Sequence, residues 1–236
     1  MTHPNHFAIP SVGTNCEPMF KEEHAMKRYD RYALISVSDK TGIVPFAKGL
    51  RKLGFGIIST GGTATELKGA GIEVVDISSV TGLRNNMMDG RVKTLHHRIA
   101  GGILAQTYLK EHCVTMIEED INPIDFVICN LYPFKETAAK PGCTLAQAIE
   151  NIDIGGPTML RAGAKNHERV AVICDPSDYN HVLAEMQEDV KLTQEFRFEL
   201  ACKAFAHTAS YDTAIAKYLA NQLPAEAPYI VRDTLR

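Results

Sequence analysis

The chain has 236 residues, of which 45% are hydrophobic, and its formal net charge at pH 7 is −3. This content is enough for one large core or two small ones, and the charge excludes a general attraction to nucleic acid or anionic membrane surfaces. No apolar run reaches the length of a membrane span, and no basic segment followed by an apolar core marks a secretory signal at the N-terminus.

The cysteines and histidines favour a reducing compartment and no metal site. None of the six cysteines forms a C-x-x-C pair, and Cys129 and Cys174 lie in apolar runs, where a cysteine is usually a small buried hydrophobe. His96 and His97 are neighbours, but no H-x-x-x-H or H-E-x-x-H spacing occurs. We therefore expect a cytoplasmic protein that binds no metal ion.

The chain begins with a polar, irregular stretch, residues 1–28, which contains three prolines. It predicts a mobile N-terminal extension or a strap. The remaining residues, 29–236, are expected to form one domain. Its first part alternates apolar runs with helical spacing, in the order strand 32–37, helix 43–53, strand 55–59, helix 64–70, strand 72–77. This βαβαβ order with short connections predicts a parallel sheet with right-handed crossovers.

The segment 78–97 has no clean period and holds a basic cluster, so we expect a long functional loop there. Residues 101–105 read as another strand or as the start of a helix. The later elements are expected at helix 110–120, strand 124–130, helix 144–149, helix 157–166, strand 170–174, helix 176–188 and helix 193–219, before an irregular tail from Pro224. The predicted fold class is α/β, an open and mostly parallel sheet with helices on both faces plus C-terminal helices.

One stretch predicts an anion site. A buried strand ends in Ser59 and Thr60, two glycines follow at Gly61 and Gly62, and Thr63 precedes a helix. The glycines allow close approach of a ligand, the first helical turn offers free N–H groups, and the hydroxyls add hydrogen bonds. We expect a phosphate to bind here; the structural alternative is an ordinary strand-to-helix turn.

Further polar residues follow the other predicted strands. In an open parallel sheet, ligands bind outside the carboxyl ends of the strands. Those ends, and two loops, carry Ser36, Ser38, Lys40, Asn130, Tyr132, Arg91, Lys93, Thr94 and the run Asp153-Ile154-Gly155-Gly156. The signatures G-x-G-x-x-G, G-x-x-x-x-G-K-S/T and G-x-S-x-G are missing, which counts against a nicotinamide dehydrogenase, a nucleoside triphosphatase and an α/β-hydrolase.

Several strings together resemble one family. They are SVSDKTG (36–42), STGGTA (59–64), DGRVKTLH (89–96), GGILA (101–105), NLYPF (130–134), NIDIGG (151–156), LRAGAKNH (160–167) and KAFAHTA (203–209). In this order they resemble the inosine monophosphate cyclohydrolase domain, of methylglyoxal-synthase-like fold, of the bifunctional purine-biosynthesis enzyme. STGGT alone also suits methylglyoxal synthase and a regulatory domain of carbamoyl phosphate synthetase, whereas RVKTLH with NLYPF and IDIGG is specific.

The resemblance implies a homodimer that closes the purine ring of 5-formamidoimidazole-4-carboxamide ribonucleotide, losing water, with neither metal nor redox cofactor. It implies a phosphate site at Ser36, Ser38, Lys40, Thr60, Gly61, Gly62 and Thr63. Arg91 belongs to the basic loop at the substrate, and Lys93 and Thr94 would lie over the base. Asn130 and Tyr132 would contact the base and formyl group. Asp153 and Lys165 form the family's other polar pair, and the N–H groups of Ile154, Gly155 and Gly156 would complete an oxyanion hole. A lysine would donate to the oxyanion and a carboxylate or phenol would accept a proton, with the base left open.

Each of these residues also has a structural alternative. Lys40 and Lys93 suit solvated loops, and Tyr132 suits the end of a strand. Asp153 suits a helix cap, and Lys165 suits a helix C-terminus. The family pattern also breaks at His97, usually proline, and at Ala100, usually histidine.

Two other functions stay open. A phosphate-eliminating lyase of the methylglyoxal synthase kind would use the same phosphate loop, with an aspartate base beside it. A non-catalytic module that binds a purine nucleotide would need neither Lys93 nor Tyr132. The sequence offers no formyltransferase domain after residue 219. If the chain is complete, a separate formyltransferase is expected to supply the substrate; if it is part of a longer protein, that activity lies outside the given residues. We expect neither nucleic acid nor membrane as a partner.

Overall fold

Five parallel strands form the centre of the computed structural model, which describes residues 29–84, 87–189 and 191–222. Their order across the sheet is β3-β2-β1-β4-β5. The strands are β1 (Tyr32–Val37), β2 (Gly56–Ser59), β3 (Val75–Asp76), β4 (Ile124–Asn130) and β5 (Ala171–Ile173). The predicted α/β class and parallel sheet are confirmed; the N-terminal extension and the tail from Pro224 lie outside the described residues.

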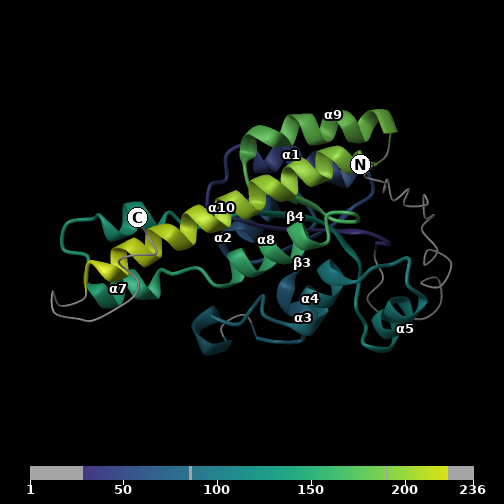
Figure 1. Cartoon of the computed structure of the whole chain (residues 1–236). Coiled ribbons are helices and arrows are strands. Elements are labelled where there is room, and N and C mark those ends of the chain that lie inside the picture. Colours follow the sequence, from purple (N-terminus) through teal and green to yellow (C-terminus); the bar gives the residue numbers. More distant parts are fainter. Residues whose placement is uncertain (1–28, 85–86, 190, 223–236) are drawn as a thin grey trace, which may run out of the picture.

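Helices connect the strands and cover both faces of the sheet (Figure 1). They are α1 (Ile43–Lys52), α2 (Gly61–Gly69), α3 (Ile77–Thr81), η2 (Met87–Gly90), α4 (His97–Leu104), α5 (Lys110–Glu118), α6 (Phe134–Ala138), α7 (Leu145–Glu150), α8 (Gly155–Lys165), η3 (Pro176–Asp178), α9 (Tyr179–Asp189) and α10 (Gln194–Ala220).

Alternate side chains of the strands feed two separate cores. Leu34 and Val127 face a core shared with α3, α4, α8 and α10, whereas Ile35 and Ile128 face one shared with α1, α2 and α9. Because both faces are covered, the central strands are mostly apolar, as their sequences predicted, with Ser36, Asp125 and Asn130 among the exceptions. α10 contributes to both cores and packs against β5, so it covers that edge of the sheet.

The third strand is much shorter than residues 72–77. Gly71, at φ 75°, ends α2, and the Ile72 N–H returns to the carbonyl of Leu67 at 3.0 Å. These contacts take the first part of the predicted strand away from the sheet. Asp76 then acts as an N-cap, its side chain accepting the Ser78 N–H at 3.0 Å, so α3 starts where a loop was expected.

Residues 101–104 are helical, the second of the two predicted alternatives, because they continue α4; Ala105 is its C-cap. His96 caps this helix, its Nδ1 accepting the Arg98 N–H at 3.2 Å. A Cβ on Gly101 or Gly102 would collide with residues 121–124, so the two glycines allow α4 to lie against the chain that enters β4. The segment 78–97 therefore holds parts of three short helices around the basic loop.

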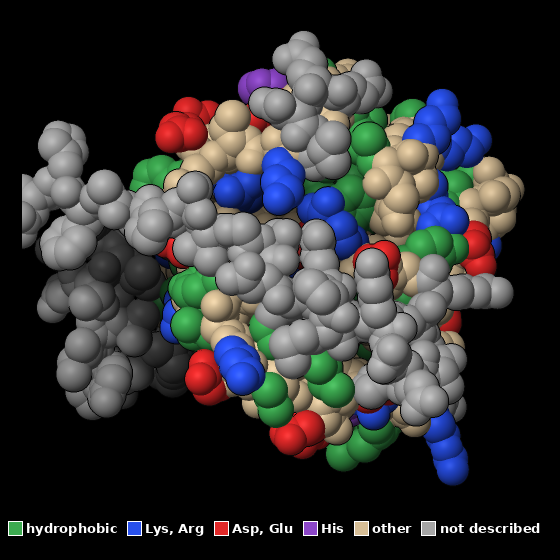
Figure 2. Space-filling model, turned by 90° about the vertical axis from the view of Figure 1, so that its right-hand side faces the viewer, with side chains coloured by type: hydrophobic (Ala, Val, Ile, Leu, Met, Phe, Trp, Pro, Cys, Tyr) green, Lys and Arg blue, Asp and Glu red, His purple; other side chains and the backbone are tan. Residues whose placement is uncertain are grey.

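The surface carries charges of both signs, in keeping with the small net charge. Figure 2 shows acidic and basic side chains together on one face, part of which lies behind residues that are not described. Within the part of the chain that the structure describes, no helix is long and apolar enough to cross a membrane.

Candidate active site

The carboxyl ends of β1, β2 and β4 lie side by side, as predicted. Ile35 pairs with Ser59 on one side of β1, and Val37 pairs with Asn130 on the other. The residues that follow these strands therefore gather at one edge of the sheet. This edge holds Ser38 and Lys40 after β1, and Thr60 after β2.

The glycine loop is itself the first turn of α2, three residues earlier than predicted. Thr60 occupies the N-cap position but its side chain makes no cap hydrogen bond, and Gly61 has a φ of 56°. Two lysines approach the loop: a Cβ on Gly61 would lie 3.6 Å from Lys93 Nζ, and one on Gly62 would lie 3.9 Å from Lys40 Nζ. A helix N-terminus between two ammonium groups suits an anionic ligand.

The hydroxyls of Ser59 and Thr63 bond to the backbone of β1 rather than pointing to a ligand. Ser59 is fully buried and donates to the Ile35 carbonyl at 2.7 Å. The Thr63 hydroxyl accepts the Val37 N–H at 3.1 Å and donates to the Val37 carbonyl at 2.9 Å. The expectation that these hydroxyls add bonds to a ligand is therefore corrected; Thr63 has only its backbone N–H to offer.

Asn130 holds a loop rather than facing open space. Its Oδ1 accepts the N–H groups of Ser38 and Asp39 at 2.7 and 2.8 Å, and its Nδ2 donates to the Asp39 carbonyl at 2.9 Å. The amide thus fixes the turn that leads to Lys40, whose Nζ donates weakly to the Ser38 carbonyl at 3.4 Å. Direct contact of Asn130 with a substrate is not what this geometry favours.

Asp153 lies in the turn that starts α8, and its carboxylate Oδ1 accepts the Gly156 N–H at 2.9 Å. Burial raises the pKa of Asp153 above its ordinary value, while the hydrogen bond from Gly156 and the positive charge of Lys93 act in the opposite direction. A carboxyl group with a raised pKa beside a lysine is suited to proton transfer near neutral pH.

The start of α8 is closely packed around this carboxylate. A Cβ on Gly155 would collide with the Thr94 hydroxyl, and one on Gly156 with Asp153 and Leu131. The Gly156 N–H is already donated to Asp153, which corrects the prediction that it completes an oxyanion hole. The Asp153 side chain accepts a first-turn N–H of α8, as a capping group does, although Ile154 holds the N-cap position.

The remaining predicted residues of the edge are less enclosed. Arg91 forms an ion pair with Glu150 of α7, and both side chains are exposed. Ser36 is half-buried within β1. Tyr132 follows β4 and is 61% exposed, and Ile154 is 57% exposed, so both side chains are open to a ligand or a partner.

Lys165 is not brought to this edge. It is the last residue of α8, whereas Asp153 precedes the first, and a helix of 11 residues separates them by roughly 15 Å. Lys165 instead lines a groove of about 560 Å³ between α8, α10 and the end of α4, together with Arg161, Phe198 and Phe205. Within one copy of the chain the predicted pair of Asp153 and Lys165 is therefore separated.

Tyr211 is a site residue that our reading of the sequence missed. Its hydroxyl oxygen accepts the Asp153 N–H at 2.8 Å, although 58 residues separate them. The signal was available, since Leu200, Ala204, Thr208 and Tyr211 follow each other at helical spacing on the buried face of α10. A tyrosine on such a face needs a hydrogen-bond partner.

The structure also bears on metal binding. Among the residues in the ranges 29–84, 87–189 and 191–222, no group of three or more His, Cys, Asp or Glu side chains is placed to hold a metal ion.

The chain is similar to known proteins along most of its length. The family model described as MGS-like domain matches residues 42–158, and the model described as AICARFT/IMPCHase bienzyme matches residues 163–235. The bifunctional purine biosynthesis protein PurH of Bacillus mycoides is 56% identical over 202 residues, 86% of this chain and 39% of that protein. Its counterpart in Bacillus cereus is 56% identical over 196 residues, 83% of this chain and 38% of that protein.

A solved structure gives the same assignment. The crystal structure of ForH superposes with a TM-score of 0.71 at 38% identity, covering 81% of this chain and 99% of that one. The chain spans about two fifths of the length of the curated relatives that it matches. The chain belongs to the family of the methylglyoxal-synthase-like inosine monophosphate cyclohydrolase domain of the bifunctional purine biosynthesis proteins.

Proposed function

We propose that this chain closes the purine ring of 5-formamidoimidazole-4-carboxamide ribonucleotide to give inosine monophosphate and water. The observation that carries the proposal is the meeting of three features at one edge of the sheet. These are the open N-terminus of α2, the two lysines Lys40 and Lys93 beside it, and the half-buried carboxyl of Asp153, on which the charge of Lys93 acts.

The substrate's 5′-phosphate fits the start of α2. The backbone N–H groups of Gly61, Gly62 and Thr63 offer hydrogen bonds, and Lys40 offers charge. Ser36, Ser38 and Thr60 border the same position, and Arg91 reaches it if it leaves Glu150. Holding one end of the nucleotide leaves the base over Lys93 and Thr94, with Tyr132 on the open side.

The reaction needs proximity, charge stabilisation and the net transfer of two protons to the formyl oxygen, one from the carboxamide nitrogen and one from the formamide nitrogen. The carboxamide nitrogen attacks the formyl carbon, a C–N bond forms, and the formyl oxygen becomes an alkoxide. Lys93 stabilises that charge and supplies a proton, and Asp153 is our candidate to take a proton from the amide nitrogen. A second proton then converts the hydroxyl to water, which leaves, and the former formamide nitrogen loses its own proton as the ring becomes aromatic.

Turnover with the formamido ribonucleotide tests the proposal, with inosine monophosphate detected by its ultraviolet absorbance. Lys93→Ala is expected to lower kcat about 100-fold or more while product binding is largely retained. Lys48→Ala, on the exposed face of α1, is the matched control and should leave kcat unchanged. Loss of activity in both variants, or in neither, contradicts the assigned role of Lys93.

The same assay separates the two alternatives. Turnover of dihydroxyacetone phosphate would indicate the phosphate-eliminating lyase. Tight binding of inosine monophosphate without turnover of either compound would indicate a regulatory nucleotide-binding module. The charge of Lys93 acts on Asp153, and a lysine with a carboxyl group suits the proton transfers of the cyclisation, so this arrangement favours the cyclohydrolase.

The domain extent, the compartment and the preceding reaction are also part of the proposal. We propose that residues 29–236 act as one cyclohydrolase domain in the cytoplasm, where Cys129 and Cys174 stay reduced. The substrate carries a formyl group, so a formyl-transfer reaction must precede this step.

We propose further that the active species is a homodimer. The groove between α8 and α10 leaves Phe198 54% exposed and Phe205 40% exposed, beside the cations Arg161 and Lys165. Burying this surface against a second copy would remove it from water. Lys165, which is far from Asp153 in one copy, has no role in our scheme for the reaction.

A further inference from the structure

Tyr211 of α10 contacts the turn that carries Asp153. The Asp153 N–H donates to its hydroxyl oxygen at 2.8 Å, and the tyrosine side chain is buried. This contact joins the C-terminal helix to a carboxyl group on which the positive charge of Lys93 acts. No other hydrogen bond of the Asp153 N–H is seen among the described residues.

The turn has little freedom on its other sides. Gly156 has no room for a Cβ against Asp153 and Leu131, and the Gly156 N–H donates to Asp153 Oδ1 at 2.9 Å. The Tyr211 ring also meets Phe134 edge-on at 6.3 Å between centroids, and Phe134 follows Tyr132 by two residues. Tyr211 thus supports both the Asp153 turn and the segment that carries Tyr132.

We propose that Tyr211 is a positioning residue of the cyclisation site, which fixes the Asp153 backbone so that its carboxyl group stays beside Lys93. The inference rests on the proposed function. Tyr211 acts through Asp153, because its hydroxyl is occupied by the Asp153 N–H rather than turned to a substrate.

Three titratable groups interact with Asp153: Lys93 from the basic loop, Cys129 from β4 and Tyr211 from α10. Asp212 is exposed on α10 and acts on Tyr211. Burial raises the pKa of Tyr211, so its hydroxyl stays protonated at neutral pH. Removing that hydroxyl lets water reach the turn, which should lower the pKa of Asp153 toward its ordinary value.

Tyr211→Phe tests the inference, because it keeps the ring and removes only the hydroxyl that accepts the Asp153 N–H. We expect kcat to fall ten- to one-hundredfold with KM changed less than about twofold, since the Asp153 carboxyl is misplaced while phosphate binding is intact. The acidic limb of the pH profile of kcat should move to lower pH. Tyr218→Phe is the matched control, since Tyr218 also lies on α10 and meets Phe134 edge-on at 5.5 Å.

A direct measurement keeps the test independent of the reaction. The carboxyl carbon of Asp153 can be followed by ¹³C NMR through a pH titration, with the signal assigned by its loss in Asp153→Asn. A lower pKa of Asp153 in Tyr211→Phe than in the unmodified chain supports positioning even if the chain fails to turn over the formamido ribonucleotide. An unchanged Asp153 titration, or a pH profile that matches Tyr218→Phe, overturns it.

Discussion

The charged carboxylate of Asp153 lowers the stability of the folded chain, because it is partly removed from water at the proposed site. Burial is the largest influence on this carboxyl group and raises its pKa, despite Lys93 and the hydrogen bond from Gly156. The folded chain therefore binds the proton more tightly than the unfolded chain. Between the ordinary carboxyl pKa and the raised one, the free energy of unfolding falls as pH rises, and above both the full cost remains.

We therefore predict that Asp153→Asn raises the midpoint of thermal unfolding at pH 7. Asparagine keeps an Oδ1 acceptor for the Gly156 N–H but carries no charge to be desolvated. The gain should disappear below the ordinary pKa of a carboxyl group, near pH 4, where Asp153 itself is neutral. Thermal unfolding followed by circular dichroism across this pH range measures it.

The same variant should lose activity. If Asp153 accepts the amide proton, kcat falls about 100-fold or more, so stability and activity change in opposite directions. Asp212→Asn, an exposed position on α10, serves as the control and should alter neither quantity. A lower unfolding midpoint for Asp153→Asn at pH 7 would show that the attraction of Lys93 outweighs burial.

Sequence patterns identified which residues meet, but not which of their atoms stay free. Thr63 and Asn130 lie at the predicted edge, yet the Thr63 hydroxyl and the Asn130 amide are satisfied by the backbone of residues 37–39. A buried polar side chain must find a partner, and the nearest strand or loop often supplies it. That choice depends on three-dimensional distances, which a residue's type and place in the chain do not contain.

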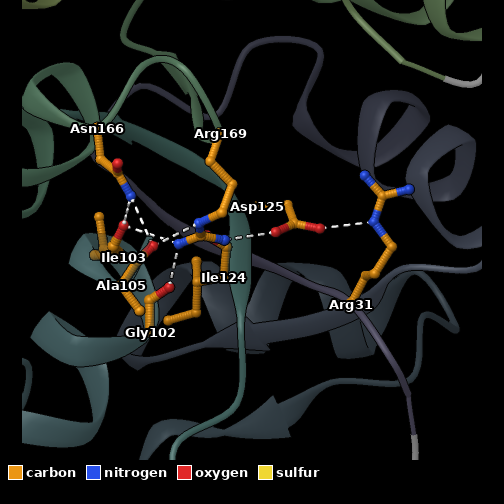
Figure 3. Close-up of polar contacts among 8 residues, drawn as sticks. All are labelled: Arg31, Gly102, Ile103, Ala105, Ile124, Asp125, Asn166 and Arg169. Atoms are coloured by element: carbon orange, nitrogen blue, oxygen red, sulfur yellow. Dashed lines mark hydrogen bonds and ion pairs between the residues drawn. The ribbon is translucent and has the colours of Figure 1, made fainter. Parts of the chain in front are cut away.

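At the scale of elements, one buried arginine holds α4 to the sheet. Figure 3 shows Arg169 surrounded by backbone carbonyls, with Asp125 between it and Arg31. Its guanidinium donates to the carbonyls of Gly102, Ile103, Ala105 and Ile124 and to Asp125 Oδ1. Asn166 Nδ2 also donates to the Ile103 and Ala105 carbonyls, so Arg169 and Asn166 together satisfy the carbonyls at the end of α4. α4 follows directly on the loop of Lys93 and Thr94.

Arg169→Met is expected to lower the free energy of unfolding by about 3 kcal/mol or more. The apolar chain fills much of the volume but removes the Arg169 donor from the Gly102 carbonyl, leaves the Ile103 and Ala105 carbonyls to Asn166, and leaves Asp125 with Arg31. Urea denaturation followed by fluorescence or circular dichroism measures the change. Lys48→Met, exposed on α1, should stay within about 0.5 kcal/mol, and an Arg169→Met loss as small as that would refute the cap role.

Long periodic elements were predictable, and short ones were not. The strands at 32–37 and 124–130 and the helix α10 have strong patterns over their full length, and the structure places them within two residues of expectation. The predictions for β3 and α3 were wrong because each boundary depends on one local hydrogen bond. These bonds run from the Ile72 N–H to the Leu67 carbonyl and from the Ser78 N–H to the Asp76 side chain. Patterns average over many residues and so cannot resolve a boundary set by a single bond.

For the whole molecule, α10 connects the proposed site with the proposed dimer surface. The helix has 27 residues and is about 40 Å long. Tyr211 on its buried face holds Asp153, whereas Phe198 and Phe205 on the outer face line the groove with Arg161 of α8. A second copy seated in the groove would clamp α8 against α10, and with them the turn that begins α8. Dimerisation would then support the geometry of the site as well as the stability of the fold.

Phe205→Glu should therefore convert a dimer to a monomer at micromolar concentration. The side chain is 40% exposed, and the Arg161 guanidinium lies 5.5 Å from its ring centroid, so a carboxylate here would form a local ion pair and present charge to the partner. Sedimentation velocity measures the change. Tyr108→Glu is the control, since Tyr108 is similarly exposed, at 42%, outside the groove. A chain that sediments as a monomer before substitution, or a Phe205→Glu variant that remains dimeric, excludes this groove as the interface. Because α10 also holds Asp153, the monomer should show a lower kcat.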